Sequence, residues 1–117
     1  MPQKHTRMLN GKRYLWYTER LWALAASLKP FPKKLDEIPE LEMDCWFIDR
    51  EPTIRRISEH YQRIRDCDPS WPIILNAEGD LMDGGHRVCK ALAEGKATVM
   101  AVQFLETPAP DEIVSRR

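Results

Sequence analysis

The sequence predicts a small α+β domain, in which helices pack on a mixed sheet, and three observations lead to this fold class. Residues 73–82 form an apolar, β-branched run, a turn rich in polar residues and a second extended pair. Two segments, residues 18–28 and 52–65, repeat apolar side chains at helical spacing. Residues 98–104 have the β-rich composition of a final strand.

The composition sets limits on the class of protein. A chain of 117 residues is long enough for one domain with its own core, and its formal net charge of +0 supplies no overall field toward DNA or acidic membranes. Three well-separated cysteines argue against a disulfide framework and favour a cytoplasmic location. No segment has the length of a membrane span or the apolar core of a signal peptide, so we expect no membrane partner.

The N-terminal part, residues 1–32, is interpreted as an arm followed by a helix. Its first thirteen residues are polar and carry four basic side chains and no acidic one, which suits either a solvated tail or a basic contact arm. Thr18 can cap a helix that runs to Leu28 and ends before Pro30. The basic residues of the arm are Lys4, Arg7, Lys12 and Arg13.

Residues 33–106 are assigned to a core domain, and residues 107–117 to a loose C-terminal tail. Between the first and second helices, residues 32–42 are predicted to be a loop with a short strand near Leu35 to Ile38. The apolar and aromatic run Met43 to Ile48 is expected to be extended and buried.

The second helix carries a polar strip beside its apolar face. Arg56, His60 and Arg63 lie on one side of a helix that begins near Pro52, and this strip could close over a bound anion. The alternative is a solvated face, in which Glu59 pairs with arginines four residues before and after it.

The segment Asp83-Gly84-Gly85-His86-Arg87 is the strongest candidate site. It lies between the second strand of the 73–82 unit and a third helix, and Asp83 is a plausible N-cap of that helix. Two glycines allow close approach of a ligand, and the amides at a helix start attract anions. Arg87 can hold two phosphate oxygens and His86 can donate to one. The alternative is a structural turn with a locally satisfied histidine.

Other chemistry has weaker support. Cys89 lies one helical turn after His86, where it could be an activated thiolate, although a buried packing role is the simpler interpretation. No cysteine and histidine fall at zinc-ligand spacing, so no metal site is predicted. The four tryptophans are interpreted as core and loop anchors, with base stacking as the alternative. They are Trp16, Trp22, Trp46 and Trp71.

The stretch from Pro72 to Val102, with Asp83-Gly84-Gly85-His86-Arg87 at its centre, resembles the ParB/sulfiredoxin superfamily and looks closest to its small bacterial ParB-like members. The resemblance covers roughly residues 35–104. It implies a compact α+β fold whose glycine loop and following helix hold nucleotide phosphates. Carried over, Gly84, Gly85, His86 and Arg87 would hold the phosphates, and Arg56 would add a positive charge from the preceding helix.

Two departures from the family pattern limit what the resemblance implies. Sulfiredoxins carry their catalytic cysteine directly before the His-Arg pair, and Gly85 stands there in this chain, so sulfiredoxin chemistry is not expected. The chain also lacks the helix-turn-helix and dimerisation segments with which partition proteins read a centromere.

We therefore expect a nucleotide-binding domain, with a hydrolase or phosphotransferase activity as an open question. The expected ligand is a nucleoside triphosphate with Mg²⁺, which Asp83 or Glu40 could help to hold, while Asp83, His60 and Arg63 are accessory candidates. The alternatives are a DNA-associated module that uses the basic arm and the Arg56–His60–Arg63 strip, and a scaffold for a protein partner.

Overall fold

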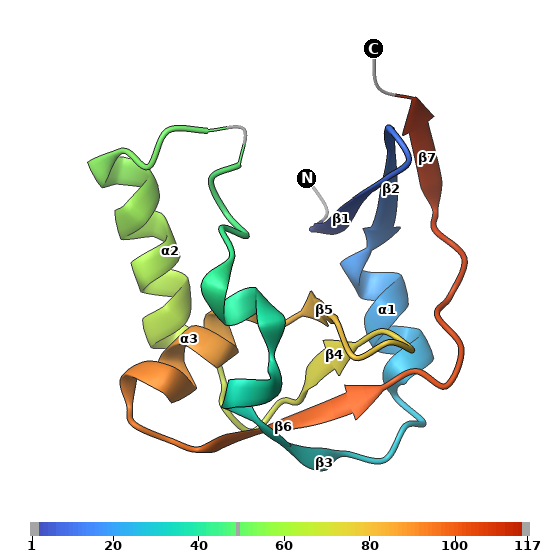
Figure 1. The fold of residues 1–117 in the computed structure, drawn as a ribbon. Coiled ribbons are helices and arrows are strands. Elements are labelled where there is room, and N and C mark those ends of the chain that lie inside the picture. The colour runs from blue at the N-terminus through green and yellow to red at the C-terminus, as the bar shows by residue number, and fades with distance from the viewer. Residues whose placement is uncertain (1–2, 49, 116–117) are drawn as a thin grey trace.

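The structure is a computed structural model that describes residues 3–48 and 50–115. It confirms the α+β class, because it combines helices with one antiparallel sheet and one mixed sheet (Figure 1). The described residues form two sheets, one of three strands in the order β1-β2-β7 and one of four in the order β3-β6-β4-β5.

The four-stranded sheet is the centre of the molecule. β4 (Ile73–Leu75) pairs antiparallel with β5 (Leu81–Asp83) and parallel with β6 (Thr98–Gln103), and β3 (Phe31–Lys34) closes the other edge antiparallel to β6. The sheet is therefore mixed, as predicted. The parallel β4–β6 pair needs a crossover connection, which includes helix α3 (Gly85–Ala93).

A hydrophobic cluster covers each face of this sheet, and β4, which is apolar at every position, contributes to both. Ile73 and Leu75 join a cluster on the side of α3, while Ile74 between them joins a cluster on the side of helix α1 (Thr18–Ala25). This alternation is the two-residue period of a strand. The first cluster comprises Leu35, Ile38, Ile73, Leu75, Val88, Ala91, Val99 and Ala101, and the second Trp16, Leu21, Ala25, Ile74, Met82, Val102 and Phe104.

The chain ends are structured, which corrects two predictions. Residues 4–17 form an antiparallel hairpin, β1 (Lys4–Leu9) and β2 (Lys12–Tyr17), in place of a solvated tail. Its turn is Asn10-Gly11, both with positive φ, and this dipeptide is a strong hairpin signal. The C-terminal segment is not loose within the described residues, because β7 (Glu112–Ser115) pairs with β2 on the side opposite β1.

Two predictions for the middle of the chain are also wrong. The short strand is β3, which lies directly before the predicted position at Leu35 to Ile38. Leu35–Glu37 is instead a 3₁₀ helix, and a second 3₁₀ helix follows at Pro39–Glu42. The run Met43 to Ile48 forms bends without a strand, and Met43 and Ile48 are 60% and 75% exposed. In the segment between α1 and α2, Leu35 and Ile38 are the residues that join the core, and Phe31 and Leu41 pack against it.

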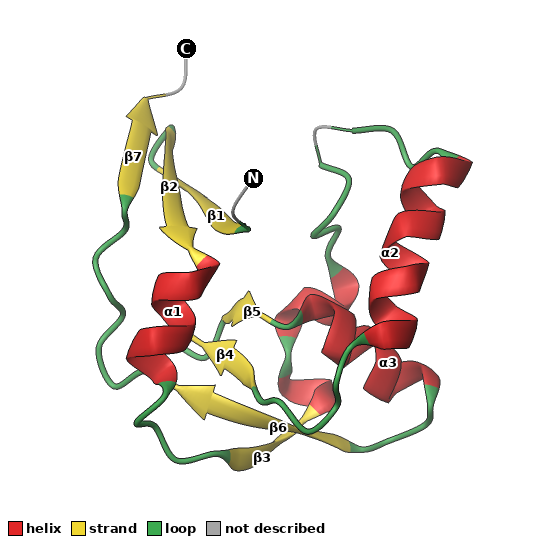
Figure 2. Ribbon diagram, turned by 180° about the vertical axis from the view of Figure 1, so that it is seen from behind, coloured by secondary structure: helices red, strands yellow, loops and turns green. Residues whose placement is uncertain are grey.

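The second predicted helix is confirmed as α2 (Ile54–Asp66), and Thr53 caps it by accepting a hydrogen bond from the Arg56 amide at 3.2 Å. α2 stands at the edge of the molecule and lies beside α3 (Figure 2). The first predicted helix is found as α1, but the predicted capping role of Thr18 is wrong, because Tyr17 is the N-cap and Thr18 is the first helical residue. α1 also ends at Ala25, before the predicted end at Leu28. The predicted boundary between residues 32 and 33 falls inside β3.

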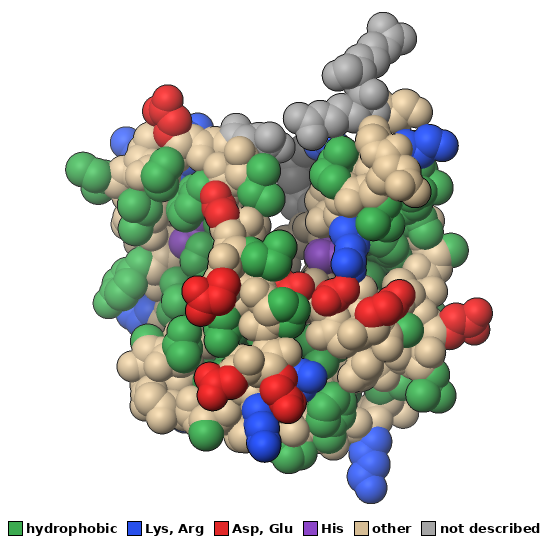
Figure 3. Space-filling model, in the orientation of Figure 1, with side chains coloured by type: hydrophobic (Ala, Val, Ile, Leu, Met, Phe, Trp, Pro, Cys, Tyr) green, Lys and Arg blue, Asp and Glu red, His purple; other side chains and the backbone are tan. Residues whose placement is uncertain are grey.

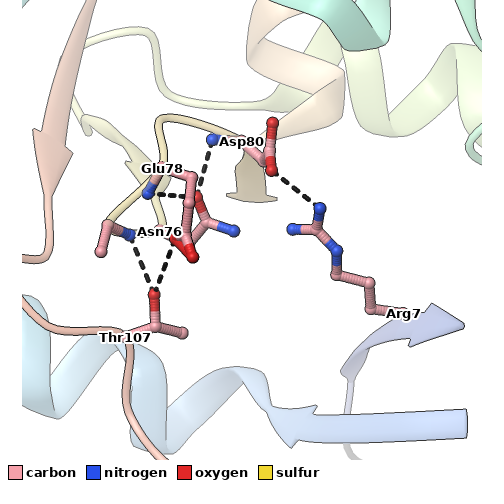
Figure 4. Close-up of polar contacts among 6 residues, drawn as sticks. Arg7, Asn76, Glu78, Asp80 and Thr107 are labelled. Atoms are coloured by element: carbon pink, nitrogen blue, oxygen red, sulfur yellow. Dashed lines mark hydrogen bonds and ion pairs between the residues drawn. The ribbon is translucent and has the colours of Figure 1, made fainter. Parts of the chain in front are cut away.

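The β4–β5 turn ties the two ends of the chain to the central sheet (Figure 4). Asn76 Oδ1 accepts hydrogen bonds from the amides of Glu78 and Asp80, which closes the turn. Arg7 of the hairpin forms a 2.8 Å ion pair with Asp80, and Thr107 accepts a hydrogen bond from the Ala77 amide at 2.9 Å. The predicted basic arm is therefore partly used for internal contacts.

Candidate functional site

The glycine motif forms the junction between β5 and α3. Asp83 is the last residue of β5, and Gly84 is the N-cap of α3, so the predicted capping role of Asp83 is wrong. Gly84 has a φ of 107°, and a Cβ at this position would lie 2.6 Å from Cγ2 of Ile73. Packing against β4 and the left-handed backbone therefore both require glycine here.

The first turn of α3 keeps the property that the sequence predicts for an anion site. Gly84 offers no side-chain hydrogen bond to the amides of this turn. Such amides carry the positive end of the helix dipole. Gly85 faces Trp46, whose Nε1 would lie 3.4 Å from a Cβ at this position, so the indole covers the start of the helix.

Trp46 also covers a pair of histidines that comes from two helices. His60 Nδ1 of α2 and His86 Nε2 of α3 lie 2.8 Å apart in a hydrogen bond. The Trp46 ring stacks on both, with ring centroids 4.7 Å from His60 and 4.8 Å from His86 and interplanar angles of 18° and 13°. Phe47 packs edge-on against His60. Among the described residues, no hydrogen bond involves Nε2 of His60, so this ring nitrogen can bind a ligand.

The pKa values of both histidines are lowered, which favours the neutral form of each ring. Burial, followed by the charges of His60, Arg63 and Arg87, lowers the pKa of His86 to about 4. Burial and the charge of Arg63 lower the pKa of His60, while Glu59 opposes this shift. Two neutral imidazoles can share one hydrogen bond, since one ring nitrogen donates and the other accepts.

The polar strip of α2 borders a small pocket next to this pair. The pocket has a volume of about 70 Å³ and is positively charged, because it is lined by three arginines, one histidine and one glutamate beside two aromatic rings. Within residues 3–48 and 50–115, neither Arg56 nor Arg63 forms an ion pair, so the predicted alternative of helix pairing through Glu59 is not found. The lining residues are Trp46, Phe47, Arg50, Arg56, Glu59, His60 and Arg63.

Arg87 does not line this pocket. Its Nη1 is 3.6 Å from the Asp83 carboxylate, its Nε donates to the Asp68 carbonyl at 3.3 Å, and its side chain is only 15% exposed. Asp83 also accepts a hydrogen bond from Trp22 at 2.8 Å. Arg87 lines a separate pocket of about 130 Å³ between α3 and β6. The structure thus joins His86 to His60, which lines the first pocket with Arg56 and Arg63, whereas Arg87 lines a different pocket.

Four residues of this pocket were not predicted as site residues, and one of them, Glu59, was considered only as an ion-pair partner. Trp46 and Phe47 lie in the run Met43 to Ile48, which was expected to be extended and buried, and Arg50 follows that run. The available signal was Asp44, whose side chain accepts hydrogen bonds from the amides of Trp46 and Phe47 and so favours a turn over a strand.

The remaining candidates for chemistry are scattered. The three cysteines are free, Cys89 is partly buried, and the described residues contain no group of three or more metal-ligating side chains. Glu40 has a buried Oε1 with no hydrogen-bond partner among the described residues. Burial, followed by the charges of Glu40 and Asp44, raises the pKa of the Cys45 thiol.

The chain matches no family model, no curated protein and no solved structure. In the part of the chain that the structure describes, no helix combines the length and apolarity needed to cross a bilayer.

Proposed function

We propose that this domain binds the phosphate groups of a nucleotide at the meeting point of α2 and α3. The observation that carries the proposal is the contact between His60 and His86, because it joins the arginine strip of α2 to the uncapped first turn of α3. The resemblance to the ParB/sulfiredoxin superfamily implies the same ligand class for the segment Gly84 to Arg87.

Each part of the site has a role in this proposal. Arg56 and Arg63 neutralise phosphate charge from α2, and His60 donates or accepts through Nε2. A pocket of about 70 Å³ has room for a phosphate group, and the base packs against the Trp46 and Phe47 rings that line it. The amides of Gly85 and His86 bind a second phosphate once Trp46 moves off Gly85.

Mg²⁺ is expected to arrive with the nucleotide, since this ion is usually held by one or two carboxylates and by substrate phosphates. Glu59 lines the pocket, and the unpartnered Oε1 of Glu40 is a second carboxylate oxygen suited to a cation. Asp83 is a poorer candidate because Trp22 and Arg87 already occupy it. Arg87 acts in this proposal as a positioning residue for the β5–α3 junction.

The test is thermal unfolding of the protein with ATP, ADP, CTP and GTP, each with and without Mg²⁺, alongside an assay for released phosphate. A ligand at about a hundred times its dissociation constant stabilises the fold by roughly 2.7 kcal/mol. We expect one nucleotide to raise the melting temperature, and Arg56→Gln combined with Arg63→Gln to abolish the shift. Phosphate release adds hydrolysis to the assignment, and its absence leaves a binding domain.

The matched control is Arg55→Gln, which removes a charge from the exposed side of the same helix and does not line the pocket. It should bind like the wild type. An equal loss of nucleotide binding in the control and in the pocket variant would show that the net charge of the helix, and not the pocket, determines binding. No shift with any nucleotide overturns the proposal, and binding of random duplex DNA that weakens steeply with salt would favour a DNA-associated module instead.

A further inference from the structure

His60 has three properties of a nucleophilic side chain, and the first is the hydrogen bond of its ring. Its Nδ1 lies 2.8 Å from Nε2 of His86, so one of these two nitrogens donates and the other accepts. When Nδ1 of His60 is the donor, the proton of this ring is held on Nδ1 and Nε2 keeps its lone pair. Covalent catalysis by histidine requires an unprotonated ring nitrogen of this kind.

The second property is the charge of the ring. Burial, and then the charge of Arg63, lowers the pKa of His60, while the neighbouring Glu59 opposes this shift. On the α3 side, burial and the charges of His60, Arg63 and Arg87 lower the pKa of His86 to about 4. The neutral form of both rings is therefore favoured at pH 7, so that His60 can attack and His86 can accept its hydrogen bond.

The third property is the position of the ring. The pocket of about 70 Å³ is lined by His60 but not by His86, so it lies away from the contact with α3. Histidine reaches the surface on the side of the molecule where α2 lies (Figure 3), and both rings are partly exposed. Arg50, Arg56 and Arg63 line the same pocket and can neutralise the negative charge of a phosphoryl group next to His60.

The orientation of the ring is also fixed by its neighbours. Trp46 stacks on it with ring centroids 4.7 Å apart and an interplanar angle of 18°. Phe47 meets it edge-on, at 5.2 Å and 78°. A nucleophile that is held in one orientation has less freedom to lose on the way to the transition state.

We propose that Nε2 of His60 accepts the terminal phosphoryl group of a nucleoside triphosphate, so that the reaction passes through a phosphohistidine. This step rests on the proposed function, because the nucleotide must first bind in the α2 pocket. It makes His60 the catalytic residue and His86 a positioning residue.

The step balances without a further reactant. The lone pair of Nε2 forms a bond to the γ-phosphorus while the bond from that phosphorus to the β–γ bridging oxygen breaks, and the nucleoside diphosphate leaves with the electron pair. The phosphorylated ring of His60 becomes positive and keeps its proton on Nδ1, where the hydrogen bond to His86 stabilises it. Water then attacks phosphorus, the electron pair of the P–N bond returns to Nε2, and dihydrogen phosphate leaves.

Labelling of the full chain tests the proposal. The protein is incubated with Mg²⁺ and with ATP, CTP or GTP that carries label in the γ-phosphate. We expect one of them to leave label on the protein that survives alkali and is lost in acid. This behaviour separates a phosphohistidine from the esters of serine and threonine and from an acyl phosphate on Glu59. Mass spectrometry should place the group on His60.

Two variants of α2 locate the nucleophile. His60→Asn removes Nε2, while its amide nitrogen takes the place of Nδ1. It should carry no label, yet nucleotide should still raise its melting temperature, because Arg56 and Arg63 remain. The matched control Tyr61→Asn changes the next residue, which is 59% exposed and does not line the pocket, and should be labelled like the wild type.

The outcomes separate this step from nucleotide binding. A nucleotide that raises the melting temperature but leaves no label on His60 overturns the phosphohistidine and keeps the binding site. Label on another residue, or label of wild-type extent in His60→Asn, overturns it in the same way. The absence of a melting shift with every nucleotide overturns both the phosphohistidine and the proposed function.

Discussion

His60 and His86, which lie 26 residues apart in the chain, meet through Nδ1 and Nε2 at 2.8 Å beneath the Trp46 indole. This hydrogen bond is the point at which α2 and α3 are joined at the candidate site. It requires that the two rings are not both protonated, because two imidazolium ions have no acceptor to offer and repel each other.

The first prediction concerns pH. The pKa of His86 is about 4, chiefly through burial, and that of His5 is also about 4, through burial and then the charge of Arg7, against an ordinary value of 6.5. A histidine whose folded pKa is depressed takes up its proton more readily in the unfolded chain, so stability should fall as the pH drops from about 6.5 toward about 4. Urea unfolding at a series of pH values measures this slope.

The double variant His5→Gln with His86→Gln is the control for that slope. It should be less stable at neutral pH, because the His60 contact is lost, but its stability should change less between pH 6.5 and 4 than that of the wild type. An equally steep slope in the double variant would assign the acid sensitivity to other groups.

The second prediction concerns Gly84. Gly84→Ala should destabilise the fold by roughly 2–5 kcal/mol, since it adds left-handed strain and a 2.6 Å approach to Ile73. Gly95→Ala is the matched control, with a φ of 75° but open space around the new methyl group, and should cost about 1–2 kcal/mol. Chemical denaturation compares the two, and equal losses would show that contact with Ile73 adds nothing.

The third prediction separates structure from binding at Arg87. Arg87→Ala should lower stability without ligand by about 1–3 kcal/mol, because it leaves the partly buried Asp83 carboxylate with only the Trp22 donor. Once the temperature is set below the new melting point, nucleotide affinity should stay within about threefold of the wild type. Calorimetric titration measures that affinity. A complete loss of binding would indicate that Arg87 contacts the phosphates directly.

The sequence was most informative where local chemistry and tertiary packing agree. The strand–turn–strand unit and the presence of α2, α3 and β6 all follow from periodicity and turn residues, and the structure confirms them. The strip of Arg56, His60 and Arg63 was predicted from helix geometry alone, and these three residues line the α2 pocket.

Local patterns could not show contacts between distant parts of the chain. Nothing near Glu112 reveals that β7 pairs with β2, almost one hundred residues earlier. The exposure of Trp46 and the engagement of Arg87 by Asp68 likewise depend on how α2, α3 and their loops pack. The hairpin at residues 4–17 is different, because its Asn10-Gly11 turn was a local signal that the basic charge pattern obscured.

The fourth prediction concerns the C-terminal segment. Deleting residues 107–117 should destabilise the fold by at least roughly 2 kcal/mol, because Trp16 Nε1 loses the Pro108 carbonyl at 2.8 Å and the Tyr17 amide loses Asp111. A shorter deletion of residues 112–117 keeps both contacts and removes only β7, so it should cost less. Thermal unfolding ranks the three proteins, and equal melting temperatures would show that the segment contributes nothing.

The position of β2 between β1 and β7 also has a consequence for biosynthesis. Its hairpin partner β1 is its neighbour in the sequence, but β7 is translated almost one hundred residues after β2. Trp16 and Leu15 therefore stay without the segment that bonds to them while all the residues between β2 and β7 are translated. During that interval the nascent chain exposes an aromatic surface around Trp16, which makes this surface a natural target for chaperones.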